Sequence, residues 1–185
     1  KLKGNNFGVP NKYNLNPEYV NEYNPFVNLR DKFNSTAINV WHYRYMYKNI
    51  YTKQNLHRFG IIDNPNCPNC DIIEDSNHLL WECPNVIQSW ENFSRVVSEI
   101  DITMQNLVLS KEQIVYGFKT GLTAKVHNCI LGKIKQSIMQ PSRKIVSANL
   151  IKEFYKFQLL YENKLNCKSL QSRWTNINTN VLFNQ

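Results

Sequence analysis

The stretch CPNCDIIEDSNHLLWEC, residues 67–83, gathers three of the chain's five cysteines and one of its four histidines. The spacing is C-x2-C, then seven residues, then H-x4-C. A C-x2-C pair presents two thiolates from a tight turn, and a second pair of ligands completes the tetrahedron that Zn2+ accepts from Cys and His. We therefore predict one zinc ion held by Cys67, Cys70, His78 and Cys83.

Four protein ligands complete the coordination of a tetrahedral zinc ion, so no position is left for water or substrate and the predicted zinc is structural. Two other interpretations exist. Cys67 and Cys70 could form a redox pair, but thioredoxin-like pairs lie in a βαβ context that we do not find in this sequence. The cysteines could also be buried without a ligand, as free Cys often is, which would make their spacing with His78 a coincidence.

The residues around the cluster show helical periodicity, so we predict a mostly α fold in which a small zinc knuckle is inserted between helices. The first helix is expected to begin at the N-cap signal Asn34-Ser35-Thr36 and to stop at Gly60. Ser147 is a further N-cap candidate, and Pro141 ends the helix before it. The expected helices are residues 35–60, 86–100, 121–140, 148–165 and the shorter 170–177.

Apolar residues three and four positions apart predict the buried face of each helix. The expected stripes are Val40, Tyr43, Tyr47 and Ile50; Val86, Trp90, Phe93 and Val97; Leu122, Val126, Ile130, Ile134 and Ile138; and Leu150, Phe154, Phe157 and Tyr161. A second face of the first helix carries Trp41, Arg44, Tyr45 and Lys48. It could stack on bases and hold phosphates, or its aromatic rings could simply pack inside. The apolar run 114–116 is expected as a strand or buried turn, and the Asn-rich C-terminus is expected to fray.

These elements divide the chain into three parts. Residues 1–31 are rich in Asn, Pro and Tyr without a sustained period, which indicates an extended or loosely docked arm. Residues 32–100 hold the first helix, the knuckle at 67–83 and the helix after it. Residues 101–185 form a basic helical region, because eleven Lys and Arg but two Glu lie between Gln113 and the end.

Charge and the lack of targeting signals narrow the class of protein. The net charge of +8 favours a polyanionic partner. We find no secretory signal and no apolar run long enough to span a bilayer, so no membrane partner is expected. Clustered cysteines favour a reducing compartment, and we expect an intracellular protein of the nucleus and cytoplasm. Since the sequence starts at Lys1 without an initiator Met, we expect it to be a piece of a longer polypeptide.

The neighbourhood of the cluster is more specific than the cluster itself. Residues 56–93, LHRFGIIDNPNCPNCDIIEDSNHLLWECPNVIQSWENF, resemble the C-terminal zinc-knuckle (CCHC) segment of non-LTR, LINE-type retrotransposon reverse transcriptases. The shared pattern is an L-x-x-x-G-I-x-D lead-in, C-x-x-C, an acidic residue before H-L-(L/F)-W-x-C, and an apolar helix with Trp. It is carried here by Leu56, Gly60, Ile61, Asp63, Cys67, Cys70, Glu74, His78, Leu79, Leu80, Trp81, Cys83 and Trp90. The family often has Glu-Thr ahead of the His, where this chain has Asp75-Ser76. The similarity extends over roughly residues 32–177.

The resemblance implies the C-terminal part of a polyprotein whose upstream part carries a reverse transcriptase and usually an endonuclease. The paired-Asp polymerase motif is absent from this sequence, as is the P-D…K arrangement of a restriction-like nuclease, so we expect no catalytic centre in this chain. The implied partners are the upstream reverse transcriptase domain, the RNA template and the target DNA of target-primed reverse transcription. RNA is the first expectation among the nucleic acids.

Nucleic acid binding is expected from the basic helices and not from the acidic knuckle, because affinity for phosphates comes mainly from Lys and Arg. The candidates are Lys125, Lys133, Lys135, Arg143, Lys144, Lys152 and Lys156, with Arg44 and Lys48 from the first helix and Trp81 from the knuckle. Trp81 is either the plug between the flanking helices or a base-stacking platform, and we favour the plug. The leading hypothesis is an accessory zinc- and nucleic-acid-binding domain of a LINE-type reverse transcriptase. The alternative is a structural or protein-interaction module that packs on the reverse transcriptase with little nucleic acid contact.

Overall fold

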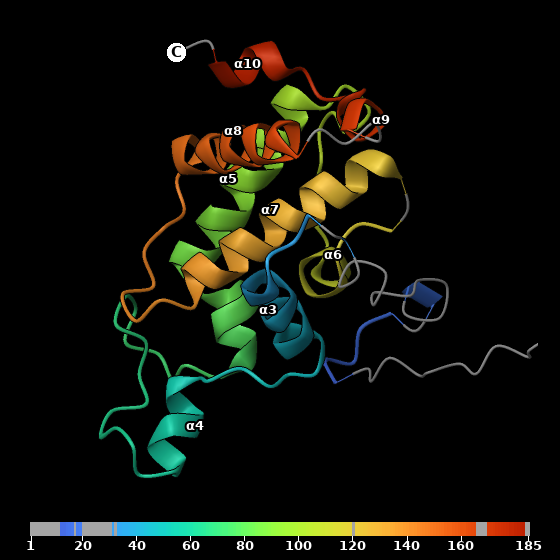
Figure 1. Ribbon diagram of the computed structural model, residues 1–185. Coiled ribbons are helices and arrows are strands. Elements are labelled where there is room, and N and C mark those ends of the chain that lie inside the picture. Colours follow the sequence, from blue (N-terminus) through green and yellow to red (C-terminus); the bar gives the residue numbers. More distant parts are fainter. Residues whose placement is uncertain are drawn as a thin grey trace, which may run out of the picture.

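The chain folds into a bundle of helices, seen in the computed structural model of Figure 1. The structure describes residues 12–16, 18–19, 31, 33–119, 121–165 and 170–183. The elements are α3 (Thr36–Met46), α4 (Lys53–Arg58), the π-helical turn η1 (His78–Glu82), α5 (Pro84–Ile100), α6 (Lys111–Tyr116), α7 (Leu122–Ile138), α8 (Ala148–Lys164), α9 (Leu170–Trp174) and α10 (Thr179–Phe183). No strand occurs within the described ranges, which contain two isolated β-bridges, Asn66 with Ile73 and Asp101 with Ile177. The predicted mostly α fold is confirmed.

Helix α7 runs through the middle of the bundle (Figure 1) and packs against α3, α5, α8 and α9. Helix α5 packs against α8 and η1, and α10 closes over α5 and α8. One hydrophobic core joins these elements and includes the described arm residues Tyr13 and Leu15. Of the predicted arm, residues 1–31, the structure describes residues 12–16, 18–19 and 31. The other residues of the arm lie outside the described part of the chain. The division of the chain into three parts stays a prediction.

Several predicted helices form as their capping signals indicate. Ser35 caps α3 by accepting the Ile38 amide, and Ser147 caps α8 by accepting the Leu150 amide. Helix α5 begins at Pro84, a residue suited to the first helical position. The predicted stripes of α5 and α7 are buried, with Leu122 outside the described side chains. Among the helices within the described ranges, none is both long and apolar enough to cross a membrane.

The prediction of a single helix over 35–60 is wrong, because the helix is interrupted between Met46 and Lys53. Lys48 takes a left-handed conformation with φ 53°, and the Asn49 amide reaches back to the Arg44 carbonyl. This closure is of the Schellman type, which is usually built on Gly, so Lys at the left-handed position does not signal it. Thr52 then caps α4 by accepting the Asn55 amide.

The buried faces predicted for α3 and α8 are wrong in part, although Ile50 is buried and Tyr47 and Phe154 pack against the core. Val40 and Tyr43 are exposed, whereas α3 buries Ile38, His42, Tyr45 and Met46. On α8, Leu150, Phe157 and Tyr161 are exposed, whereas Ile151, Tyr155, Gln158 and Glu162 are buried. Each buried face contains polar side chains whose hydrogen-bond partners lie on other helices, which hydrophobic periodicity cannot register.

Two local predictions, for residues 114–116 and for the Asn-rich C-terminus, are corrected. Residues 114–116 form the end of helix α6 and not a strand, and a capping box between Ser110 and Gln113 starts that helix. The Asn-rich segment forms the short helix α10, whose Leu182 is fully buried. The Asn178 amide donates to the Ile100 carbonyl at 2.6 Å, which ties this segment to the end of α5.

Candidate metal centre

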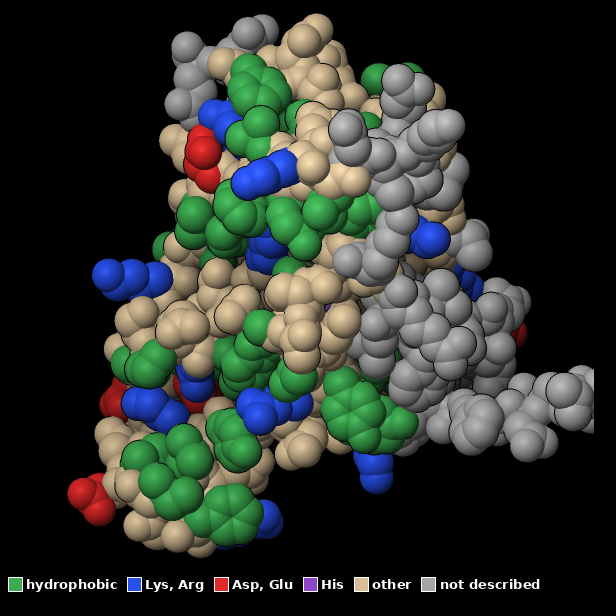
Figure 2. Space-filling model, viewed as in Figure 1, with side chains coloured by type: hydrophobic (Ala, Val, Ile, Leu, Met, Phe, Trp, Pro, Cys, Tyr) green, Lys and Arg blue, Asp and Glu red, His purple; other side chains and the backbone are tan. Residues whose placement is uncertain are grey.

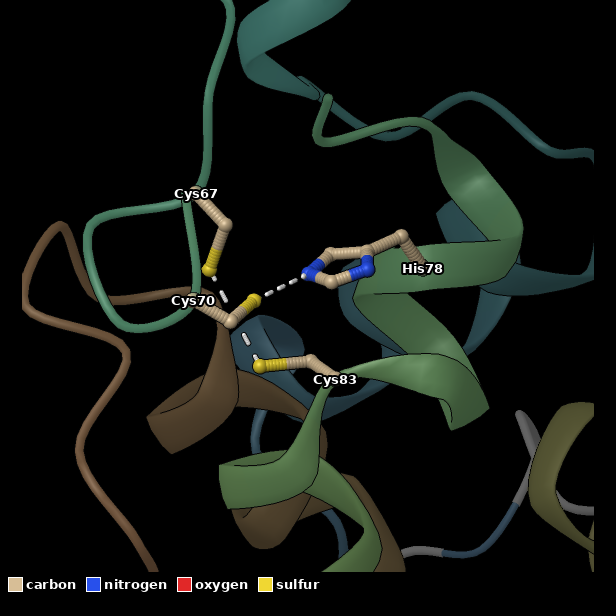
Figure 3. Close-up of side chains that lie close together, drawn as sticks. All are labelled: Cys67, Cys70, His78 and Cys83. Carbon is tan, nitrogen blue, oxygen red and sulfur yellow. Dashed lines mark hydrogen bonds between the residues drawn. The ribbon is translucent and has the colours of Figure 1, made fainter. Parts of the chain in front are cut away.

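Cys67, Cys70, His78 and Cys83 come together at one point of the structure (Figure 3). Their ligand atoms all lie within 4.8 Å of one another. The Cys67 and Cys83 sulfurs are 3.8 Å apart, and the Cys70 sulfur lies 3.2 Å from His78 Nε2. Cys67, His78 and Cys83 are buried, and Cys70 is partly exposed at the edge of the cluster.

A π-helical turn places His78 and Cys83 on the same side of the chain. The Cys83 amide donates to the His78 carbonyl at 2.9 Å, which closes the turn over five residues. In an α-helix, residues five apart point roughly 140° away from each other, so an H-x4-C pair on a regular helix could not bind one ion. The wider turn corrects this angle. Single π-turns of this kind are frequent at functional sites.

The C-x2-C pair lies on a compact loop opposite this turn. The Cys67 amide donates to the Ile72 carbonyl, and the Asp71 amide donates to the Cys67 carbonyl. Asp71 adopts φ 55°, a left-handed conformation that Asp tolerates better than most residues. Asp75 accepts the His78 amide at 2.8 Å and so fixes the start of the histidine's turn. The backbone hydrogen bonds of the loop and the turn therefore position the four donor side chains.

The donor set fits a tetrahedral zinc ion. Zn–S bonds of about 2.3 Å in a tetrahedron require sulfurs about 3.8 Å apart, and the Cys67–Cys83 distance has this value. Three cysteines and one histidine are a common ligand set for structural zinc. Burial raises the pKa of the Cys83 thiol to about 11, so a bound cation is what would hold this sulfur as a thiolate at neutral pH.

A buried ion pair ties the cluster segment, residues 67–83, to the rest of the bundle. Glu74 is fully buried and accepts from Arg143 through both oxygens, at 2.8 Å from Nη2 and 3.1 Å from Nε. Glu74 also accepts the Lys53 amide at the start of α4. The Arg143 carbonyl in turn accepts from the side-chain amides of Asn69 and Asn85. The loop between α7 and α8 is thus fastened to the cluster on two sides.

Two of the residues predicted to bind nucleic acid are buried inside the protein. Arg143 is 6% exposed and bonded to Glu74. Lys135 is fully buried, with its Nζ 3.2 Å from His42 Nδ1 and 3.1 Å from the Val115 carbonyl. Both predictions are corrected, because neither cation can reach a phosphate on the surface of this fold.

The other Lys and Arg residues predicted to bind nucleic acid lie at or near the surface. Lys152 pairs with Glu99 at 2.9 Å, and Lys156 pairs with Glu153 at 2.7 Å. Lys133 lies over the Phe157 ring at 4.9 Å, and burial lowers its pKa. Lys48 and Lys144 are exposed, whereas Lys125 and Arg44 are half-buried. These positions belong to α3, α7, α8 and the segments next to them.

Trp81 lies between two ligands and is partly buried against the core. The Tyr13 ring meets it edge-on, with centroids 5.5 Å apart, and Lys111 Nζ lies 5.0 Å above its centroid. The aromatic face of α3 is divided, since Tyr45 is fully buried and Trp41 is half-buried beneath Arg44. For Tyr45, internal packing is confirmed.

Sequence reasoning missed the structural role of Glu74. The knuckle was treated as acidic without regard to burial, yet its Glu74 is fully buried. One signal was available, because the resemblance singles out an acidic residue at this position. The partner Arg143, 69 residues away, could not have been found from spacing.

Comparison with known proteins supports the class of site that this geometry defines. Residues 13–90 match the model of a family described as zinc-binding in reverse transcriptase, a range that contains all four donors. No curated protein and no solved structure matches the chain significantly. Residues 13–90 are therefore similar to the zinc-binding segments associated with reverse transcriptases. Zinc is the ion that both the family and the donor set support.

Proposed function

We propose that this chain is an accessory, non-catalytic C-terminal domain of a LINE-type retrotransposon reverse transcriptase, with a CCHC knuckle that holds one structural zinc ion. The observation that carries the proposal is the cluster of four donors within 4.8 Å, inside the segment that matches a reverse-transcriptase zinc-binding family. Four protein ligands leave a tetrahedral ion no position for substrate. The zinc therefore stabilises the junction between the loop, η1 and α5.

The domain binds nucleic acid for its polymerase, with the RNA template as first ligand and the target DNA as second. The net charge of +8 supports this part of the proposal, since phosphate neutralisation supplies most nonspecific affinity. Lys48 and Lys144 are exposed on the surface, and Lys125 is half-buried. The role is to hold template or target during target-primed reverse transcription.

The test is a titration of the zinc-loaded chain against labelled single-stranded RNA, single-stranded DNA and duplex DNA at several salt concentrations. We expect log K to fall with log salt at a slope equivalent to roughly four or more phosphate contacts. The order of affinities then identifies the strand that is held. Weak binding to all three ligands with little dependence on salt would contradict a nucleic-acid-binding role.

A protein-interaction module is the second candidate, and one observation favours it. Helix α8 leaves a row of apolar side chains in solvent, with Phe157 64% and Leu160 60% exposed. Apolar side chains also gather at the end of the molecule where α4 lies (Figure 2), and Phe59 and Ile61 are exposed there. Exposed apolar patches of this kind commonly mark protein contacts. In this case the domain packs on the reverse transcriptase, and the titration gives the negative result.

A further inference from the structure

A groove runs along α5 beside the zinc cluster. It has a volume of about 510 Å3 and lies between α5, the segment 107–111 and η1. Trp81 and Trp90 line it, and the apolar side chains of Ile87 and Val108 stay exposed at its rim. Ligand pockets typically have volumes of about 300–1,000 Å3 and a mostly apolar lining with a few polar groups. The groove meets that description.

Cations accompany the aromatic lining of this groove. Lys111 and Arg95 both line it, and Lys111 Nζ lies 5.0 Å above the Trp81 ring. Beyond Trp81, Lys48 Nζ lies 5.3 Å over the ring of Tyr13. Within the described part of the chain, neither Lys48 nor Lys111 forms a salt bridge, although the Lys111 charge helps to lower the pKa of the neighbouring Glu112 carboxyl. Two exposed cations are therefore placed against aromatic faces.

The cluster segment holds the Trp81 ring in a fixed place. Trp81 belongs to the π-turn that the His78–Cys83 hydrogen bond closes. The Trp90 indole donates to the Leu80 carbonyl at 2.7 Å, which anchors the same turn to α5. Tyr13 is a positioning residue, because it is buried, bonded to the Tyr45 carbonyl and packed edge-on against the Trp81 ring. An aromatic surface held in this way loses little entropy when a ligand stacks on it.

We propose that this groove binds single-stranded nucleic acid, with one base stacked on Trp81 and neighbouring phosphates on Lys111 and Arg95. The inference rests on the proposed function and gives it a location. A stacked base needs an aromatic face beside cations, and this combination is how single strands are held without sequence preference. Glu91 also lines the groove, but the two cations outnumber it. A base-paired strand cannot offer an unstacked base, so duplex DNA is a poorer ligand at this site.

The experiment compares Trp81→Leu and Lys111→Gln with the unaltered zinc-loaded chain. Binding of labelled single-stranded RNA, single-stranded DNA and duplex DNA is measured over a range of salt. We expect Trp81→Leu to weaken single-strand binding by roughly 5- to 100-fold, as the loss of one stacked base would, and to change duplex binding far less. Lys111→Gln is expected to reduce the salt slope for single strands by about 0.7.

Matched variants separate this site from general charge and folding effects. Lys164→Gln removes one exposed cation elsewhere and should leave Trp81-dependent binding intact. Trp41→Leu removes an indole on α3 and should bind single strands as the unaltered chain does. If Trp81→Leu loses its zinc, the Lys111→Gln variant tests the groove instead, because the Lys111 ammonium is exposed and its removal should not disturb the fold.

The possible outcomes distinguish the two proposals. If the unaltered chain binds single strands and both groove variants bind equally well, the inference is wrong while the proposed function stands. The groove would then be a protein contact. Equal losses for single strands and duplex would also overturn base stacking. If the unaltered chain binds none of the three ligands, the proposed function and this inference both fall.

Discussion

Glu74 and Arg143 form a buried ion pair between the cluster segment and the loop before α8. Both side chains are buried, and the guanidinium meets the two carboxylate oxygens in a bidentate arrangement. Desolvation opposes the formation of a buried pair, but removal of one partner leaves the other charge buried without compensation. The pair therefore matters more when broken than its net contribution suggests.

We predict that Glu74→Gln lowers the free energy of unfolding of the zinc-loaded chain by about 3 kcal/mol, the lower end for breaking a buried ion pair. Urea denaturation followed by circular dichroism measures the change. Glu82→Gln, which removes the same charge from an exposed position of the same segment, is the control and should stay within about 0.5 kcal/mol. Equal effects of the two substitutions would show that the ion pair is not what stabilises this junction.

Lys135 is a buried cation with neutral neighbours. Its Nζ contacts His42 Nδ1 and the Val115 carbonyl and lies 5.1 Å from the centroid of the Tyr45 ring. Burial lowers the pKa of Lys135 to about 7. Burial, followed by the nearby charge of Lys135, also holds the pKa of His42 well below its ordinary value.

This depressed pKa predicts stability that rises with pH. Between about pH 7 and pH 10 the unfolded chain keeps a proton on Lys135 that the folded chain has released, so the free energy of unfolding increases with pH. The cost of burying the charge is fully present below pH 7. Urea denaturation at several pH values should show a slope of up to about 1.4 kcal/mol per pH unit from this group. Lys135→Met should remove that contribution, and an unchanged slope would contradict it.

At the scale of elements, α3 and α7 approach each other closely at Gly132. A β-carbon at this position would meet Ile38 Cγ2 and would lie 2.8 Å from His42 Nε2. His42 Nε2 is also 2.9 Å from the Asn128 carbonyl one turn earlier on α7. Gly132 is therefore required by the approach of two helices and not by its backbone angles.

We predict that Gly132→Ala destabilises the fold by about 1–2 kcal/mol. Alanine favours a helix interior over glycine by about 1 kcal/mol, but overpacking in a dense contact costs about 1–3 kcal/mol. Thermal or urea denaturation gives the sign. Gln136→Ala, one turn further along α7, tests helix propensity without the close contact. A stabilising Gly132→Ala would mean that α3 can move away from α7 at little cost.

At the scale of the whole molecule, zinc is expected to add a link between the C-x2-C loop, η1 and the start of α5, which also share the hydrophobic core. The C-x2-C loop, η1 and the start of α5 meet at the four donors (Figure 3). The Glu74–Arg143 pair then carries this connection to the loop before α8. Structural zinc contributes folding free energy directly, since the ligand cluster does not exist in the unfolded chain.

Removal of zinc should unfold the region around residues 56–95. Metal analysis of the purified chain is expected to give one zinc ion per molecule, and a strong chelator should reduce the far-UV circular dichroism and expose this region to protease. Readdition of zinc should reverse both changes. Cys70→Ser should behave like the chelated chain. Unchanged circular dichroism and unchanged protease resistance after chelation would show that the zinc is not structural.

Net charge is also a property of the whole molecule, and here it overstates the basic surface. Three cations of the basic C-terminal region, Lys135, Arg143 and Arg173, are buried. Arg173 pairs with Asp31 and Glu162, and Lys152 and Lys156 are paired at the surface. The charge of +8 therefore supports nucleic acid binding without locating it.

The sequence by itself determined what depends on neighbours along the chain. Spacing was enough to predict the metal ligands that the structure brings together, because Cys67, Cys70, His78 and Cys83 lie within seventeen residues and one loop and turn suffice to converge them. Capping residues such as Ser35 and Ser147 fixed helix starts for the same local reason. The mostly α class followed from periodicity, whose signal is strong in long helices such as α5 and α7.

Only the tertiary structure decided which faces are buried and which cations are free. Helices α3 and α8 turn polar side chains inward, because His42 on α3 and Gln158 on α8 meet partners on α7, and Glu162 on α8 meets a partner on α9. The sequence alone predicts Arg143 and Lys135 as surface cations. In the fold they lie beside Glu74 and His42, which are 69 and 93 residues away along the chain. The groove next to Trp81 likewise joins three elements that sequence spacing does not connect. Hydrophobic periodicity reports only the polarity of each residue. A polar side chain can be buried where the folded chain supplies a hydrogen-bond or ion-pair partner, and the sequence does not show that partner.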